Sequence, residues 1–236
     1  TFTNTQRGTA VIASKTVPDG AVGAFRFTGV PTGTLPTNGT LIAANLRPGT
    51  YSSTVSDPAP EFDTVSVSCD DANSATPSSG DPQTRTAIFN VDPGEMVQCT
   101  FTYARRGTVI AVAEVNSDIA DGSFRYTGVP TGTISLGGEL VVERLSPGTY
   151  TTTEIDPAPD FDLVDVACND SESATVSSGN AATRTAIYNL DAGETVRCIF
   201  SHEVATGTIA SDLNPALPDG ASDNGINPFE TPDRDL

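Results

Sequence analysis

The 236-residue chain is predicted to be an all-β protein of two tandem antiparallel β-sandwiches, on three observations. The sequence repeats at an offset of 99 residues, which aligns residues 8–106 with residues 107–205 without a gap. Short segments alternate apolar with polar residues, the period of strands that bury one face. Turn residues separate these segments about every ten residues, and helical periodicity is absent. We therefore expect about seven short strands in each unit.

The first unit shows the strand and turn pattern in order along the chain. Residues 24–28, 64–68 and 85–89 each alternate apolar and polar side chains, as half-buried strands do. Between such segments lie pairs that supply the fixed or positive φ of a tight turn. These pairs are Asp19-Gly20, Asn38-Gly39, Pro48-Gly49 and Pro93-Gly94.

The two ends of the chain carry fragments of the same repeat. Residues 1–4 resemble residues 100–103, so residues 1–7 are interpreted as the closing strand of a preceding repeat or an exchanged strand. Residues 207–210 resemble the start of each unit, so residues 206–236 are expected to hold a partial next-repeat strand and an acidic tail rich in Pro and Asp. Either the chain belongs to a longer array, or the end strands pair with neighbouring molecules by strand addition.

Charge and composition exclude several classes of function. With 30 acidic and 12 basic residues the net charge is −18, which argues against a nucleic-acid partner. Lysine occurs only at Lys15 and histidine only at His202, so the groups needed for acid–base or nucleophilic catalysis are scarce and an enzyme is not expected. No apolar run reaches the roughly 18 residues that span a bilayer, so no membrane insertion is expected.

The four cysteines are expected to form one disulfide in each unit. Cys69 and Cys99 are 30 positions apart, and Cys168 and Cys198 repeat that spacing. A zinc site would need a short spacing between ligands, which the sequence lacks. Bonds closing loops of this length stabilise by about 3 to 4 kcal/mol, and they imply an oxidising compartment, hence a secreted or surface protein.

Several short motifs point to a known family. They are Gly-Thr at the start of each unit, residues 25–29, residues 48–51 and residues 99–103. With these motifs the chain resembles the prealbumin-like repeats of bacterial surface proteins, which are related to the CnaB- and SpaA-type domains of adhesins and pilins. The resemblance implies an Ig-like sandwich used as a stalk module on the bacterial cell surface.

Many members of that family join a first-strand Lys to a last-strand Asn through an isopeptide bond that a mid-domain Glu promotes. In the first unit Lys15 is present at the Lys position. Val55, however, occupies the position of the Glu, and Tyr103 occupies that of the Asn.

The second unit is incomplete in a different way. Glu154 stands at the Glu position, but Glu114 replaces the Lys and His202 replaces the Asn. Because each unit lacks two of the three groups, we predict no isopeptide bond in either unit, with the disulfide as the substitute cross-link.

Acidic loop residues raise the question of a metal ion. Two sets follow the first cysteine of each pair: Asp70, Asp71 and Asn73, and Asn169, Asp170 and Glu172. They lack the regular ligand spacing of a calcium loop, so solvated loop acids are the favoured interpretation. No cofactor is expected, and the acidity leaves weak calcium binding open.

The sequence thus predicts a structural repeat module of a secreted or cell-surface stalk, filament or adhesin. Its expected partners are other copies of itself or neighbouring repeats, joined head to tail. The charges of −3 on residues 8–106 and −11 on residues 107–205 would favour such contacts. The alternative is an adhesive module that binds a glycan or a protein through the loop tips at residues 31–34 and 130–133. An enzymatic role would depend on His202.

Overall fold

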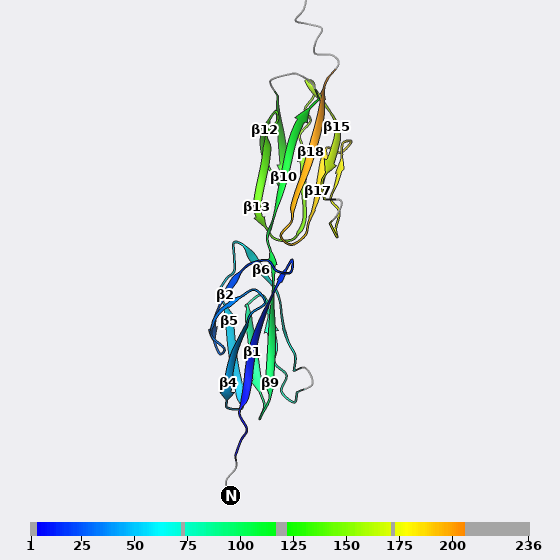
Figure 1. The fold of residues 1–236 in the computed structure, drawn as a ribbon. Helices are drawn as coiled ribbons and strands as arrows, with labels where there is room; N and C mark the ends of the chain where they lie inside the picture. Colours follow the sequence, from blue (N-terminus) through cyan, green and yellow to red (C-terminus); the bar gives the residue numbers. More distant parts are fainter. Residues whose placement is uncertain (1–3, 72–73, 117–121, 171–172, 206–236) are drawn as a thin grey trace, which may run out of the picture.

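The computed structural model describes residues 4–71, 74–116, 122–170 and 173–205. These residues form two β-sandwiches, one after the other along the length of the molecule (Figure 1). Eighteen strands are present, and no helix occurs within the described ranges. The predicted all-β fold with two tandem sandwiches is confirmed.

Each unit contains nine strands in the same order. The first unit comprises β1 (Gly8–Val17), β2 (Ala24–Gly29), β3 (Gly33–Pro36), β4 (Thr40–Leu46), β5 (Gly49–Val55), β6 (Phe62–Cys69), β7 (Ser79–Asp81), β8 (Thr86–Val91) and β9 (Met96–Arg105). The second unit comprises β10 (Gly107–Val115), β11 (Ser123–Gly128), β12 (Gly132–Ser135), β13 (Glu139–Leu145), β14 (Gly148–Glu154), β15 (Phe161–Cys168), β16 (Ser178–Asn180), β17 (Thr185–Leu190) and β18 (Thr195–Val204). The strands beyond the expected seven are short ones such as β3 and β7, in which too few residues alternate to give a sequence signal.

Two sheets pack face to face in each unit. In the first unit a four-stranded sheet, in the order β4-β1-β9-β6, covers a five-stranded sheet in the order β3-β2-β5-β8-β7. The second unit repeats both orders as β13-β10-β18-β15 and β12-β11-β14-β17-β16. The core lies between the sheets, where the inward residues of the alternating pattern meet.

Aromatic side chains from facing strands fill this core. Phe27 of β2 meets Phe101 of β9 edge to face, with the ring centroids 4.9 Å apart. In the second unit Tyr126 and Phe200 take the same places at the same 4.9 Å. All four rings are almost completely buried, so the alternation seen in the sequence identifies the core face correctly.

The first and last strands of each unit are neighbours that run parallel. β1 pairs with β9 from Thr9 opposite Met96 to Val17 opposite Ala104, and β10 pairs with β18 in the same way. All other strand pairs are antiparallel, as expected. Because the two strands are parallel, the chain enters a unit at one end, here named the entry end, and leaves it at the opposite exit end.

Turns form where the sequence predicts them. Asn38 adopts a positive φ of 58° in the turn that leads into β4, and Gly20 and Gly94 have φ values of 80° and 76°. Gly29 ends β2 with a φ of 104° at a point where a Cβ atom would collide with the carbonyl oxygen of Ser52. Residues with a side chain would be strained there, which explains why glycine occupies this position.

Each unit contains one disulfide, between the cysteines that the spacing pairs. Cys69 of β6 is bonded to Cys99 of β9, and Cys168 of β15 is bonded to Cys198 of β18. The bonded residues lie directly opposite each other on neighbouring antiparallel strands. The bond therefore ties the edge strand of the four-stranded sheet to the strand that leaves the unit.

Part of the prediction for the chain ends falls outside the described residues. This holds for residues 1–3 and for the whole segment 206–236, with its expected next-repeat strand and acidic tail. The described residues 4–7 are exposed and are not in a strand. Strand addition at either end stays a prediction.

Replacing both Cys168 and Cys198 by Ala should lower the free energy of unfolding of the second unit by about 3 to 4 kcal/mol, because the denatured chain regains the freedom of a loop of about 30 residues. Calorimetry should show this unit melting earlier while the first unit keeps its transition. Equal loss in both units would contradict independent folding, and the matching Cys69 and Cys99 variant provides the reciprocal control.

Candidate functional site

The positions aligned with an isopeptide bond in the first unit do not meet at one point. Val55 at the end of β5 and Tyr103 in β9 are both buried in one core cluster. Lys15 is exposed, because the inward residues of this part of β1 are Ser14 and Thr16. Lys15 stands at the position of the family's first-strand Lys, but the alternation of side chains along β1 points it away from Tyr103. The absence of the bond itself stays a prediction.

In the second unit two of the three positions are in direct contact. Glu114 is exposed on β10, as Lys15 is on β1. His202 Nε2 lies 2.7 Å from Glu154 Oε1, and both side chains are completely buried. The residues that the family alignment identified as an incomplete bond site thus form a buried polar pair of their own.

Further contacts surround this pair on all sides. His202 Nδ1 lies 3.0 Å from the backbone oxygen of Glu114, and the imidazole stacks on Phe124 with a centroid distance of 3.9 Å. The Tyr126 hydroxyl donates to Glu154 Oε1 over 3.3 Å. Glu154 Oε2 has no hydrogen-bond partner among the described residues. The contact within the pair and these two hydrogen bonds compensate the burial of the polar groups.

The hydrogen-bond partners define where the protons lie. A backbone carbonyl can only accept, so His202 Nδ1 carries a hydrogen, and one further proton is shared between Nε2 and Glu154. Burial and the neighbouring Glu154 charge raise the pKa of Tyr126, which therefore stays protonated and remains the donor. The cluster is sealed from solvent, so His202 cannot meet a substrate in this structure.

The first unit has less polar side chains at the three equivalent positions. Phe27 takes the place of Tyr126, Val55 that of Glu154 and Tyr103 that of His202. Tyr103 stacks on Phe25 with a centroid distance of 3.6 Å, and its hydroxyl, whose pKa burial raises, has no partner among the described residues. One backbone therefore accepts either a hydrogen-bonded pair or an apolar core at this point.

The acidic residues considered for calcium bind backbone groups instead. Asp71 accepts from the Ser78 N–H with both carboxylate oxygens, at 3.0 and 2.9 Å, and Asp170 accepts from the Ser177 N–H at 2.7 Å. Asp70 accepts from the Gln98 N–H at 2.7 Å. Asn73 and Glu172 lie outside the described residues. Within those residues no group of three or more His, Cys, Asp or Glu side chains could hold a metal ion.

The loop tips proposed for the alternative binding function use their polar groups internally. Thr32 donates to the Phe27 carbonyl at 3.1 Å, and the Pro31 carbonyl accepts from Ser53 at 2.7 Å. The second unit repeats both bonds: Thr131 donates to the Tyr126 carbonyl at 3.1 Å, and Thr152 donates to the Pro130 carbonyl at 3.0 Å. These hydrogen bonds attach the loops to the sandwich.

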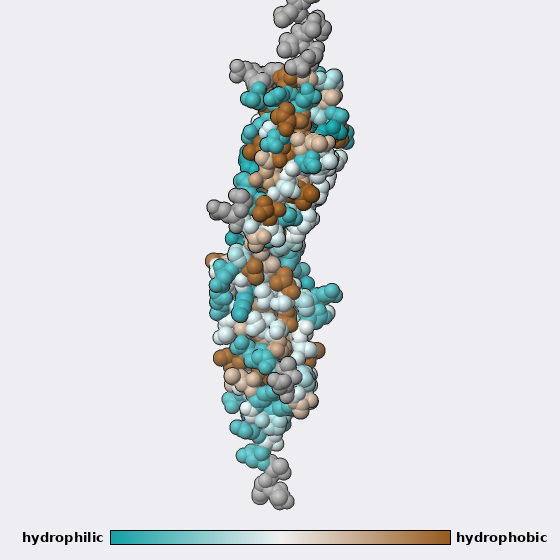
Figure 2. All heavy atoms as spheres, turned by 90° about the vertical axis from the view of Figure 1, so that its right-hand side faces the viewer, coloured by the Kyte–Doolittle hydropathy of each residue, from teal (hydrophilic) through white to brown (hydrophobic). Residues whose placement is uncertain are grey.

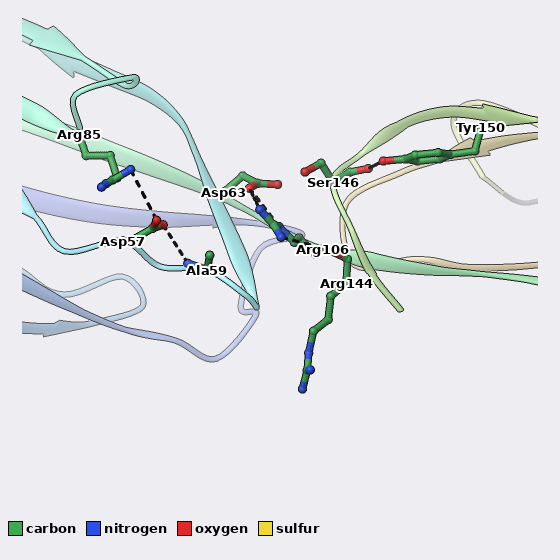
Figure 3. A network of polar contacts seen from close by, with 8 residues as sticks. All are labelled: Asp57, Ala59, Asp63, Arg85, Arg106, Arg144, Ser146 and Tyr150. Carbon is green, nitrogen blue, oxygen red and sulfur yellow. Dashed lines mark hydrogen bonds and ion pairs between the residues drawn. The ribbon is translucent and has the colours of Figure 1, made fainter. Parts of the chain in front are cut away.

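A network of polar contacts lies where the two units meet (Figure 3). Arg106, the single residue between β9 and β10, lies between Asp63 of the first unit and Arg144 and Ser146 of the second. Its Nε and Nη2 atoms donate to Asp63 Oδ1 at 3.0 and 2.6 Å, and its Nη1 donates to the Arg144 carbonyl at 3.5 Å. Burial raises the pKa of Asp63, but the hydrogen bonds from Arg106 and Ser146 outweigh it and hold the pKa below its usual value.

Two further contacts cross the junction. Arg144 Nε donates to Glu61 Oε1 over 3.0 Å, and the Gly193 N–H donates to the Arg105 carbonyl over 2.8 Å. A Cβ atom on Gly193 would lie 3.0 Å from Pro18 Cδ, so the units approach closely on this side. The sequence gives no signal that identifies these partners.

Comparisons with known proteins add little beyond the kind of fold. No family model and no curated protein matches the chain. Among solved structures, the chain is similar to the TIE protein of Bacillus anthracis, with 15% identity over 84% of this chain and 34% of that one, and a TM-score of 0.31. It is similar to a streptococcal ancillary pilin, with 15% identity over 86% of this chain and 64% of that one, and a TM-score of 0.33.

A third similar structure is an adhesin of Mobiluncus mulieris that contains intramolecular disulfide, isopeptide and ester cross-links. It shares 13% identity over 73% of this chain and 67% of that one, with a TM-score of 0.33. Two of these three structures are thus a pilin and an adhesin. The chain spans about a third of the TIE protein and less than two thirds of the ancillary pilin. A likeness this distant says nothing about activity.

Replacing Glu154 by Val alone should lower the free energy of unfolding of the second unit by about 3 kcal/mol, because it leaves the buried His202 unpaired. The combined change Tyr126→Phe, Glu154→Val and His202→Tyr installs the set of the first unit and should recover stability to within about 1 kcal/mol of the parent. Urea denaturation followed by NMR would test both variants, with the first unit as an internal reference. A triple variant no more stable than Glu154→Val would refute this account.

Replacing Asp63 by Asn should widen the distribution of angles between the units, because Arg106 loses its charged acceptor. Lowering the pH should widen this distribution of angles in the same way. Since the folded-state pKa of Asp63 lies below the ordinary value of about 3.9, the ion pair stabilises the junction above that pH and fails as pH falls below it. Distance measurements between spin labels on the two units would report both effects. Asp162→Asn, the equivalent change at the exit end of the second unit, should leave the distribution unchanged.

Proposed function

We propose that the chain is a structural repeat module of a secreted or cell-surface stalk, filament or adhesin, and that it carries tension along its length. The observation that supports this best is the parallel pairing of the strand that enters each unit with the strand that leaves it. The two strands lie side by side in the middle of one sheet, yet their outer ends point in opposite directions. Tension on the chain therefore passes directly from one strand to the other.

The direction of this load suits the sheet. Pulling β1 and β9 apart along their length slides one strand past the other, so the hydrogen bonds between them must break together rather than one by one. The ladder extends over nine residue pairs in the first unit. Such an arrangement resists force better than one in which the end strands peel away from a sheet edge.

The disulfide limits how far a unit can extend once the hydrogen bonds between β1 and β9 break. It joins β9 to β6, so the 30 residues from Cys69 to Cys99 remain a closed loop under tension. Only the rest of the unit can extend. The same holds for the second unit, where the bond between Cys168 and Cys198 has the same separation.

The surface supports a structural role outside the cell. Disulfides persist in oxidising compartments, so the two bonds support a secreted or cell-surface setting. Figure 2 shows one face on which apolar residues are scattered singly among polar ones. Among the described residues there is no helix long and apolar enough to cross a membrane. The proposed partners are other copies of the chain or neighbouring repeats, joined head to tail.

Pulling single molecules from both ends should show two unfolding events, and reduction of the disulfides should lengthen each event. The release of a loop of 30 residues adds about 100 Å of extended chain per unit. Force spectroscopy with and without a reductant measures this directly. The proposed role in carrying tension would be contradicted if the units unfolded at forces no greater than those of a sandwich whose end strands are peeled from a sheet edge.

A further inference from the structure

The entry end of the first unit carries an open basic pocket. It is lined by Thr5, Arg7, Arg47 and Pro48 and has a volume of about 540 Å³. Both arginine side chains are exposed, and neither forms an ion pair within the described part of the chain. The hydroxyl of Tyr51 donates to the Arg47 carbonyl at 2.8 Å, which fixes the turn that presents Arg47.

The junction inside the chain shows what such a pocket holds. By the offset of 99 residues, Arg7 corresponds to Arg106 and Arg47 to Ser146. In the second unit the space beside these residues contains the Asp63 carboxylate from the exit end of the first unit. The entry-end pocket of the second unit is therefore filled by an acid of the unit that precedes it.

The equivalent arginine is held in the same pose at both places. Arg7 Nη1 donates to the Asn45 carbonyl over 3.1 Å, as Arg106 Nη1 donates to the Arg144 carbonyl over 3.5 Å. Asn45 and Arg144 also correspond by the repeat. The pocket of the first unit is thus prepared for an acid in the way the occupied pocket is, and it carries a second arginine where the occupied one has a serine.

The exit end of the second unit carries the complementary charges. Asp162 corresponds to Asp63 and Asp160 to Glu61, and both aspartates are exposed. Their side chains form no ion pair within the described residues, and Ala205 stands beside Asp162 at the position that Arg106 has in the first unit. Within the described residues, the entry end thus presents two arginines that form no ion pair, and the exit end presents two acids that form none.

We propose that the entry end of one molecule binds the exit end of a second copy, with the Asp162 carboxylate placed between Arg7 and Arg47. This inference rests on the proposed structural role, for which it identifies a second copy of the chain as the partner. The Asp162 carboxylate then takes the place that the Asp63 carboxylate has beside Arg106 and Ser146 inside the chain. Residues 4–7 correspond to residues 103–106 by the repeat, but they belong to the molecule that carries the pocket, so the contact is an analogue of the internal junction and not a copy of it.

Sedimentation equilibrium and small-angle scattering at protein concentrations up to about 1 mM, the range of weak contacts, would test the contact. We expect reversible association in which the longest dimension grows while the cross-section stays constant. Asp162→Arg and Arg47→Asp should each lower the association constant about tenfold or more. Asp165→Arg, the same charge change at another exposed acid of β15, should not lower it.

The charge-reversed variants give the sharper result. A chain that carries both Arg47→Asp and Asp162→Arg should associate again, and so should a mixture of the two single variants, because each pocket then meets the opposite charge. A chain that remains monomeric over the whole range, or association that ignores Asp162→Arg, would overturn the proposal. Association lost on deletion of residues 206–236 but insensitive to Asp162→Arg would overturn it in favour of the tail as occupant.

This test is separate from that of the proposed function. Force spectroscopy is performed on single molecules and does not need association. A monomeric chain that unfolds only at high force would overturn the docking contact alone. A chain that associates through Asp162 but unfolds at low force would overturn the load-bearing role and leave the docking contact standing.

Discussion

The parallel pairing of the first and last strands is the constraint on which the rest of the structure depends. Because β1 and β9 run side by side in the same direction, the chain crosses each unit from one end to the other. Arg106 alone then connects β9 to β10, and the two sandwiches follow each other lengthwise (Figure 1). The junction contacts, the exposed pocket at one end and the exposed acids at the other all follow from that geometry.

Much of the fold is readable from the sequence, whereas the contacts between distant strands are not. The 99-residue offset, the alternation in segments such as residues 24–28 and the spacing of Cys69 and Cys99 are local or repeated signals, and they predict two sandwiches with one disulfide each. The parallel β1 and β9 pair joins segments almost a whole unit apart, and successive side chains point to opposite faces in parallel and antiparallel strands alike. Sequence alone therefore could not distinguish the two pairings.

The candidate site shows the same division. The resemblance to the family identified Glu154 and His202, but only as two positions of an incomplete isopeptide bond. Their contact could not be predicted, because it joins residues 48 positions apart. Lys15 was placed at the first-strand position although the strand period turns it outward, as the inward Ser14 and Thr16 on either side of it show. The junction partners Asp63 and Arg106 carry no motif at all, and only the packing of two units identifies them.

The difference between the two cores bears on how neighbouring repeats fold correctly. Units that share about half their residues can exchange equivalent strands, which is the characteristic misfolding route of tandem repeats. If β9 took the place of β18, Tyr103 would lie beside Glu154 and leave a buried carboxylate without its imidazole. The reverse exchange would bury His202 against Val55 and leave its Nε2 atom without the polar partner that Glu154 provides. Exchange of the closing strands thus costs stability in both units, and the buried pair favours the correct strand pairing within an otherwise repetitive chain.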